Sequence, residues 1–404
     1  MIDKLSGFQK KGQQFLDNTL FRQGFSESII LFLFGIYMIY YYLNTTMFAI
    51  QWPDNFLPYL QILLVVAVIF RCIMSNFIDK KSISIILVVM PIFLIAYQTV
   101  PFSELITNVF LLVALCGINY KQVLKIYLCV SIPITIYTII ASKMGWVTNL
   151  IYHQGERVRE SFGFIYPTDF AAHISFIIMV WILLRQLKCT YIEVGAMLLC
   201  GIFLHIYCDV RCSEIVILLL VCMVVCLKII YAKKKKKIQL PFFLKIGCLL
   251  SPIVFSGIMI LLCRFYNPNN SVMIFLNKLL SGRLFLGKRT FDDYNTTLWG
   301  QYIEMIGNGR STVVPEYYSF IDCSYLNILM RFGLFVFIAV LFLIEIIMLK
   351  NINNTFVLIA ITIVCLASMI EHHLFEFHYN IFIILPLASF KNDISLGIKR
   401  KNTL

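Results

Sequence analysis

The sequence predicts an all-α, polytopic integral membrane protein, and three observations support this fold class. Of the 404 residues, 60% are hydrophobic and only 14% are charged, whereas soluble domains are roughly 45 to 50% apolar and about 25% charged. Runs of about 20 apolar residues recur along the chain, and a helix of that length crosses the hydrocarbon of a bilayer. The runs lack the period-two alternation of membrane-spanning strands. We therefore expect one membrane domain, residues 1–404, built from helices.

The apolar runs predict about twelve transmembrane helices. Their expected ranges are 28–44, 56–74, 82–98, 102–118, 123–141, 168–185, 190–207, 213–231, 241–263, 322–348, 354–371 and 379–392. The polar start of the chain lacks the pattern of a cleavable signal peptide, so we expect the first helix to act as its own insertion signal. The 13 cysteines lie mostly inside apolar runs, and we interpret them as small apolar residues rather than as a disulfide framework.

Lysine and arginine set the expected orientation. With the N-terminus in the cytoplasm, 23 of the 34 basic residues fall on the inner side, as the positive-inside rule requires. Both termini are then expected to be cytoplasmic. The expected inner segments are 1–27, a polylysine loop at 232–240 that contacts anionic lipids, and a tail at 393–404. Two larger outer loops span 142–168 and 264–321.

The two sides also differ in the type of basic residue. The inner set holds 19 lysines and 4 arginines, whereas the outer set holds 3 lysines and 8 arginines. The outer arginines are Arg157, Arg159, Arg211, Arg264, Arg283, Arg289, Arg310 and Arg331. Topology needs only positive charge, but the planar guanidinium is the better partner for phosphate oxygens. The bias therefore predicts an anionic ligand outside, although each arginine has an alternative as the ion-pair partner of a loop carboxylate.

The outer loops carry most of the candidate chemistry. Within 264–321 we expect two short amphipathic helices, Leu276–Arg283 and Asp293–Met305, separated by a turn at Gly287–Arg289. In 142–168, Arg157 and Arg159 stand two apart on an extended segment, so both side chains point to one side. No inner loop is long enough for a nucleotide domain and no phosphate-binding loop motif occurs, so ATP coupling is not expected.

Three further positions stand out near the membrane surface. Arg211 lies in a tight outer turn, where Asp209 offers a structural ion pair as the alternative to ligand binding. Asp322 lies where the long loop re-enters the membrane, and desolvation there raises the pKa of a carboxyl and makes it a better base. Arg331 lies further along the same helix, which indicates that the helix begins in a water-filled cavity.

The stretch from Glu371 to His378 is the last candidate. It contains three histidines and two glutamates, Glu-His-His-Leu-Phe-Glu-Phe-His. Acid/base duty, hydrogen bonding, a metal site and an inert polar interface all stay open, because the HExxH pattern of zinc enzymes is absent. We expect no metal and no cofactor, since arginines supply the positive charge.

The order of these motifs resembles a known family. Ser161-Phe-Gly-Phe-Ile-Tyr-Pro-Thr-Asp-Phe follows the paired arginines, and Arg211 stands in a short outer turn. Ser281-Gly-Arg-Leu, Leu298-Trp-Gly, Asp322-Cys-Ser-Tyr-Leu-Asn-Ile-Leu-Met-Arg-Phe-Gly and a late Glu371-His follow. This order resembles the Wzy-type oligosaccharide repeat-unit polymerases of capsule, exopolysaccharide and O-antigen synthesis, which are relatives of the O-antigen ligases. The similarity extends over essentially the whole chain.

The resemblance implies a glycosyltransferase at the outer membrane face. A growing glycan on undecaprenyl pyrophosphate would be moved to a sugar hydroxyl of the next lipid-linked repeat unit. The resemblance implies a bacterial cytoplasmic (plasma) membrane and assigns pyrophosphate binding to Arg157, Arg159, Arg211, Arg283 and Arg289. Tyr325 and Arg331 are two further candidates for substrate binding. Asp322, Glu371 and His373 are the candidate proton acceptors. The expected partners are the lipid-linked oligosaccharide, membrane lipids, and a chain-length regulator and flippase of the same pathway, with no nucleic acid.

Three alternatives are carried forward. An O-antigen ligase would differ only in its acceptor, and ligases carry an essential histidine at the end of their large loop, where this chain has Asp322. A flippase or transporter of lipid-linked oligosaccharide suits the number of helices, but the two halves of the chain show no repeat. A non-catalytic scaffold leaves the outer arginine bias unexplained.

Overall fold

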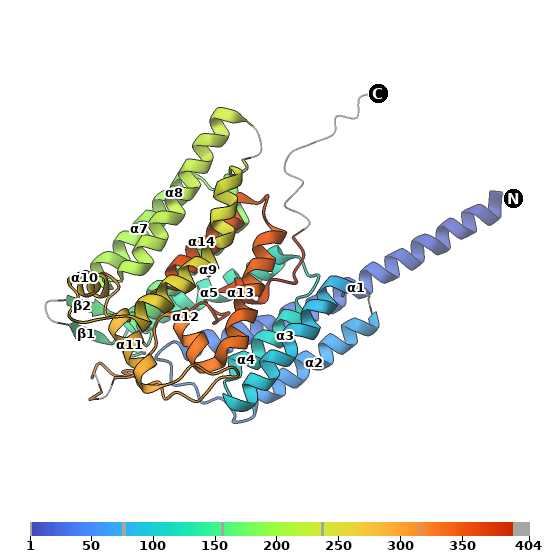
Figure 1. The fold of residues 1–404 in the computed structure, drawn as a ribbon. Helices are drawn as coiled ribbons and strands as arrows, with labels where there is room; N and C mark the ends of the chain where they lie inside the picture. The colour runs from blue at the N-terminus through green and yellow to red at the C-terminus, as the bar shows by residue number, and fades with distance from the viewer. Residues whose placement is uncertain are drawn as a thin grey trace.

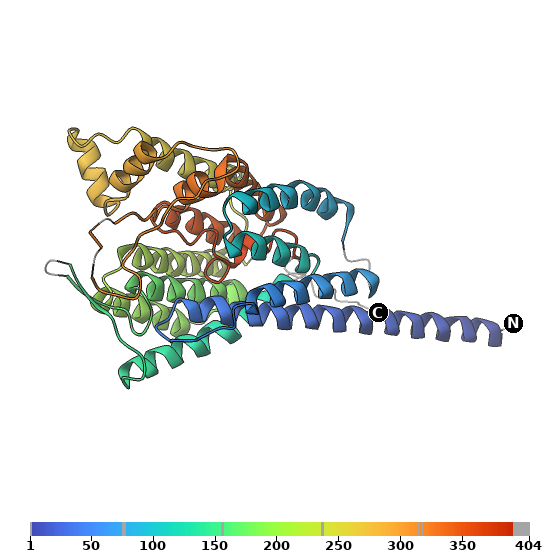
Figure 2. The same ribbon diagram turned by 90° about the horizontal axis from the view of Figure 1, so that it is seen from below.

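The protein is described by a computed structural model that covers residues 2–74, 78–154, 157–235, 238–313, 315–316 and 318–390, with side chains from Gln23 onward. In this part of the chain, eight helices are long and apolar enough to cross a membrane, and three shorter apolar helices accompany them. Figures 1 and 2 show these helices gathered into one bundle, from which the N-terminal part of α1 projects. The fold is therefore all-α, as expected of a multi-pass membrane protein.

The long apolar helices are α1 (Ile2–Asn44), α2 (Phe56–Met74), α3 (Lys80–Thr99), α5 (Tyr120–Lys143), α6 (Pro167–Arg185), α8 (Arg211–Lys234), α9 (Phe242–Arg264) and α13 (Gly333–Lys350). The three shorter apolar helices are α4 (Ser103–Ala114), α7 (Tyr191–Tyr207) and α14 (Thr355–Ala367). The remaining short helices are α10 (Ser271–Leu279), α11 (Arg283–Asp293) and α12 (Ser324–Asn327). Single turns lie at η1 (Gln186–Lys188), η2 (Ile328–Phe332) and η3 (Ile381–Ile384). Strands β1 (Ile151–Gln154) and β2 (Arg157–Glu160) form an antiparallel hairpin.

The connections expected on one side of the membrane meet at one end of the bundle. At the end expected inside, the Arg71 guanidinium donates to the carbonyls of Ala114 and Cys116 at 2.9 and 2.8 Å. At the opposite end, the Thr99 hydroxyl donates to the Trp299 carbonyl at 2.7 Å. At these contacts, segments expected on the same side of the membrane lie at the same end of the bundle. The assignment of one end to the cytoplasm stays a prediction.

A close backbone contact joins the long loop to the helix that follows it. Gly300 and Gly333 both have positive φ, +94° and +87°, a region that suits glycine. The Leu334 amide donates to the Thr297 carbonyl at 3.0 Å, and the Gln301 amide donates to the Arg331 carbonyl at 2.9 Å. The two segments quoted above as Leu298-Trp-Gly and Arg331-Phe-Gly thus pack directly on one another.

The expected amphipathic helices of this loop are partly wrong. Helices form at α10 and α11, so the expected turn at Gly287–Arg289 lies inside α11, and residues 294–305 are not helical. The chain turns instead at Ser281 and Gly282, which have φ of +52° and +86°. Gly287 is needed inside the helix because a Cβ there would lie 2.4 Å from the Cys263 sulfur. This glycine permits close helix packing rather than a turn.

The expected helix at 379–392 is also wrong within the described residues, which end at Phe390. Only the η3 turn is helical there, and the remaining chain is buried but irregular. Its backbone is satisfied by other segments, since Tyr127 and Lys350 donate to the carbonyls of Tyr379 and Pro386 at 3.1 and 2.6 Å. Non-helical backbone at membrane depth is tolerated where protein surrounds it. Apolar composition predicted burial correctly here but not the helix.

We predict that Gly333→Ala destabilises the protein by about 1 to 3 kcal/mol, because a non-glycine residue at this φ is strained. The added Cβ would also lie 2.3 Å from the Gly300 nitrogen. The matched control is Gly247→Ala in α9, where no atom lies within 4 Å of the added Cβ. Thermal unfolding in detergent should show a lower midpoint for Gly333→Ala only, and equal midpoints would contradict the described backbone contact.

Candidate functional site

Arg283 connects three segments of the outer end of the bundle. It is the first residue of α11, directly after the positive-φ residue Gly282. Its Nη2 lies 3.5 Å from Oδ2 of Asp322, and its Nε donates to the Ile370 carbonyl at 3.2 Å. The guanidinium therefore lies between the end of the long loop and the segment that follows α14.

Ser324 holds Asp322 next to Glu371. The Ser324 hydroxyl donates to the Glu371 carbonyl at 2.5 Å and accepts from the Leu374 amide at 3.1 Å. The Ser324 amide also donates to the Ser368 carbonyl at 3.0 Å. These bonds join the start of α12 to the turn after α14, so two carboxylates distant in sequence share one location.

The hairpin brings a second pair of arginines to the same end. Arg157 donates to the carboxylate of Asp209 and, at 2.7 Å, to its carbonyl. Arg159 donates to the Cys208 carbonyl at 2.9 Å. Both side chains thus point to the turn before α8, as the extended spacing predicted. Asp209, which the sequence offered as an ion-pair partner of Arg211, pairs with Arg157 instead.

Burial controls the ionisation of the central groups. It raises the pKa of Glu371 to about 7, against the opposing effects of Arg283, Cys212 and Arg159. Burial likewise raises the pKa of the Asp322 carboxyl, and Arg283 opposes this shift. The Glu371, Asp322 and Arg283 side chains keep 12, 16 and 19% of their surface exposed. A ligand can therefore reach them from outside, although water has largely been excluded.

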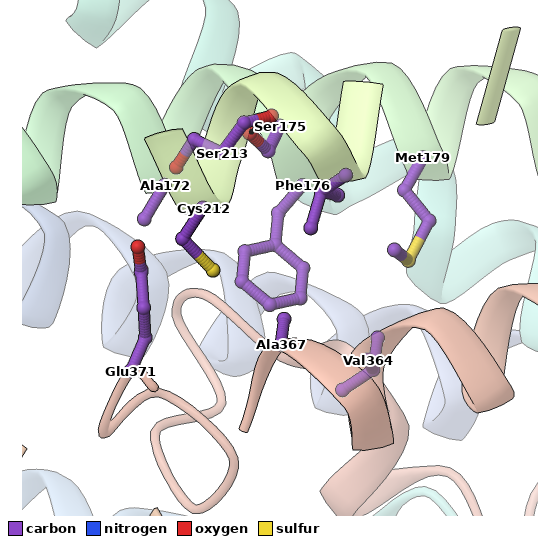
Figure 3. Close-up of a pocket in the computed structure, with 10 residues that line it drawn as sticks. Ala172, Ser175, Phe176, Met179, Cys212, Ser213, Val364, Ala367 and Glu371 are labelled. Carbon is purple, nitrogen blue, oxygen red and sulfur yellow. Dashed lines mark hydrogen bonds between the residues drawn. The ribbon is translucent and has the colours of Figure 1, made fainter. Parts of the chain in front are cut away.

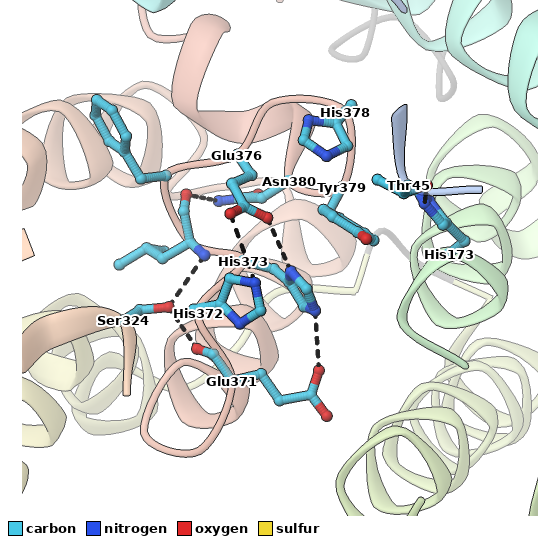
Figure 4. Close-up of polar contacts among 12 residues, drawn as sticks. Thr45, His173, Ser324, Glu371, His372, His373, Glu376, His378, Tyr379 and Asn380 are labelled. Atoms are coloured by element: carbon cyan, nitrogen blue, oxygen red, sulfur yellow. Dashed lines mark hydrogen bonds and ion pairs between the residues drawn. The ribbon is translucent and has the colours of Figure 1, made fainter. Parts of the chain in front are cut away.

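A line of alternating histidine and glutamate leads inward from Glu371 (Figure 4). Nε2 of His373 lies 3.4 Å from Oε2 of Glu371, and its Nδ1 lies 3.0 Å from Oε2 of Glu376. Nε2 of His372 lies 3.6 Å from the other oxygen of Glu376. Burial lowers the pKa of His372 to about 4 and that of His373 to about 3, so both imidazoles are neutral near pH 7.

An apolar pocket begins at Glu371 (Figure 3). It is a narrow space between α6, α8 and the end of α14, and part of it is open to the surroundings. Phe176, Met179 and Val364 supply apolar walls, and Cys212 lies beside the Glu371 side chain. The pocket therefore joins a charged group to an apolar space among membrane-spanning helices.

The other predicted site residues lie elsewhere. Arg211 is exposed at the first turn of α8. Arg289 donates to the Tyr318 carbonyl at 3.2 Å and lines a second, narrow pocket. Tyr325 is fully buried, and its hydroxyl donates to the Cys365 carbonyl at 2.6 Å. Arg331 lies deeper, 3.3 Å from Oδ1 of Asn327, with its guanidinium over the Phe102 ring.

The structure thus brings Arg283, Asp322, Glu371 and His373 together, and Arg159 is near enough to act electrostatically on Glu371. Glu376 was not among the candidate proton acceptors, although it stands in the Glu371–His378 stretch at a spacing of three from His373. Cys212 and Ser324 carried no distinguishing signal in the sequence. Glu104 did carry one, because an acidic residue stands at the start of an apolar run, and the structure places its Oε1 3.4 Å from Nδ1 of His378.

Fold and site together define a class, an all-α multi-pass membrane protein with a cluster of arginines and buried carboxylates at one end of its bundle. No protein-family model, curated protein or solved structure matches this chain. The class therefore follows from the chain's own residues.

We predict that Ser324→Ala destabilises the protein by about 1 to 3 kcal/mol, because buried polar groups lose their hydrogen-bond partner. The matched control is Ser311→Ala, whose exposed hydroxyl accepts only the local amide of Val313 at 3.1 Å. Thermal unfolding in detergent measures both. Equal midpoints would show that Ser324 does not hold the two segments together.

Proposed function

We propose that this protein is a polysaccharide polymerase of the Wzy type. It would transfer a growing glycan from undecaprenyl pyrophosphate to a sugar hydroxyl of another lipid-linked repeat unit. One observation carries the proposal, namely that Arg283 lies with the carboxylates of Asp322 and Glu371, and that Glu371 also lines an apolar pocket. A lipid pyrophosphate needs cationic groups beside an apolar space, and this arrangement offers both.

The leaving group explains the arginines. Transfer breaks the bond between the anomeric carbon and the pyrophosphate oxygen, and forms a bond from that carbon to the acceptor oxygen. Negative charge grows on the pyrophosphate as its bond breaks, and guanidiniums in a site with little water stabilise that charge. The activated sugar supplies the energy, which agrees with the absence of an ATP motif in the sequence.

A carboxylate accepts the proton of the acceptor hydroxyl. Among the three candidates, His373 lies between Glu371 and Glu376 and keeps only 4% of its side chain exposed. Asp322 is the ion-pair partner of Arg283. Glu371 lies at the mouth of the pocket and near two arginines, so we assign it the role of general base and Asp322 the role of positioning Arg283.

A second candidate function has one observation in its favour. Glu104, Arg331, Glu376 and His378 form a buried ionisable cluster beneath the outer site. Ionisable residues at membrane depth often mark ion or substrate pathways, so this cluster favours a flippase or transporter.

A ligase differs from a polymerase only in its acceptor, and the same arginine and carboxylate cluster suits it equally.

We predict that Arg283→Ala, and separately Arg159→Ala, reduces long polymer to single repeat units. Loss of a group that stabilises transition-state charge costs about 10²- to 10³-fold in rate. The matched control is Lys278→Ala, which removes an exposed basic residue from α10, in the same loop as Arg283. Glycan length is read from gels of cells that express each variant equally. Wild-type chain length in both arginine variants would reject the proposal.

An assay with purified protein decides between polymerase, ligase and flippase. Purified protein is incubated with undecaprenyl-pyrophosphate repeat units in detergent, where no second compartment exists. Product ladders support a polymerase, and unchanged substrate under conditions that preserve substrate binding supports a flippase. Transfer that needs an added lipid A core acceptor supports a ligase.

We predict that Glu371→Gln lowers the rate of elongation by about 10²- to 10⁴-fold, because general-base assistance is lost. Binding of the lipid pyrophosphate should persist, since glutamine removes no cation. Asp322→Asn serves as the comparison, and it should weaken binding more than it slows the chemical step. Elongation by Glu371→Gln at the wild-type rate would exclude this residue as the proton acceptor.

A further inference from the structure

His372, His373 and Glu376 direct ligand atoms toward one point. Nδ1 of His373 and Nε2 of His372 lie 3.0 and 3.6 Å from the two oxygens of Glu376. One ligand atom from each of the three residues lies within 4.8 Å of the others. In a tetrahedral zinc site with bonds of about 2.0 to 2.1 Å, neighbouring ligand atoms are roughly 3.3 to 3.4 Å apart. A zinc-sized ion therefore fits after small side-chain rotations.

Glu371 supplies the outer partner that such a site needs. With Nδ1 of His373 facing the ion, its Nε2 carries the proton and faces Oε2 of Glu371 at 3.4 Å. A metal-bound histidine usually donates its other ring N–H to a carboxylate or carbonyl, which fixes the ring. Figure 4 shows His373 between the two glutamates in this arrangement. The Tyr379 ring, 3.9 Å from the His373 ring between centroids, supports its orientation.

The local charges also leave room for a divalent cation. Glu371, Glu376 and Glu104 contribute three carboxylates to this region, and Arg331 acts on the two inner ones as the opposing cation. Asp322 and Arg283 form their own pair. A divalent cation held by Glu376 would add positive charge to a region in which Arg331 is the cation that acts on Glu376 and Glu104.

We propose that His372, His373 and Glu376 bind one divalent transition-metal ion, zinc by chemistry, and that Glu371 orients His373. Two imidazoles and one carboxylate are ligands suited to zinc and neighbouring first-row metals, and less suited to Mg²⁺ or Ca²⁺. The ion would fix the turn after α14 and thus the position of Glu371. The proposed site does not require the transfer reaction, although it shares Glu371 with the proposed function, and it departs from the sequence-based expectation that the protein needs no metal.

Metal content tests the proposal. Full-length protein in detergent is stripped with a chelator, equilibrated with zinc, desalted and measured for zinc per chain. Wild type should retain stoichiometric zinc, whereas His372→Ala and Glu376→Ala should lose it. His205→Ala is the matched control, because Nδ1 of His205 pairs with Glu214 at 3.0 Å on an exposed surface. Equal zinc in all four proteins would assign the metal to other groups, such as exposed cysteines, and overturn the proposal.

Two further measurements keep the test decisive if a ligand variant fails to fold. Wild type loaded with Co²⁺ should show the visible absorption of a nitrogen- and oxygen-bound tetrahedral ion, and a spectrum without those bands would overturn the proposal. Glu371→Gln, which keeps the three ligands, should weaken zinc affinity by about 10- to 100-fold. Unchanged affinity would remove Glu371 from the site. None of these measurements depends on transferase activity.

Discussion

The outer site depends on one constraint, which is that buried backbone in a membrane protein needs hydrogen-bond partners within the protein. The chain after α14 leaves helical conformation and returns to the other end of the bundle as a buried, irregular segment. Asn108 meets part of the demand by donating to the Phe375 carbonyl at 2.7 Å, and Asn380 donates to the Leu374 carbonyl at 2.7 Å. The Ser324 hydroxyl meets another part of this demand by donating to the Glu371 carbonyl. The same bonds that permit the irregular chain also position its glutamates and histidines.

The helices were largely predictable because long apolar runs report membrane burial directly. The last apolar run shows the limit of that reasoning. Hydropathy measures transfer out of water, and residues 379–390 are as buried as a helix would be, but surrounding protein rather than their own helix satisfies their backbone. The turn at Ser281 and Gly282 shows a second limit, because two glycines of this loop have different structural roles. Gly287 permits close helix packing, whereas Gly282 adopts a positive φ.

The site was predictable in part for a related reason. Residue type alone indicated an anion-binding outer face, and the spacing of Arg157 and Arg159 predicted that both point to one side. Sequence could not indicate that Tyr325 donates to a carbonyl in the core, since its partner Cys365 lies in another helix. Nor could it join Arg283 to Asp322 and Glu371, because that contact requires the long loop to fold back over the turn after α14.

The distance between each arginine and its carboxylate partner distinguishes arginines that stabilise the fold from those suited to bind a ligand. Arg157 binds Asp209 through both its carboxylate and its carbonyl, so releasing it would cost two contacts at once. The nearest charged atoms of Arg283 and Asp322 lie 3.5 Å apart, whereas strong charge-assisted hydrogen bonds measure about 2.7 to 2.9 Å. A phosphate oxygen that approaches to hydrogen-bond distance would therefore make a shorter contact with Arg283 than Asp322 does, which makes Arg283 the best placed of these arginines to change partners during a reaction.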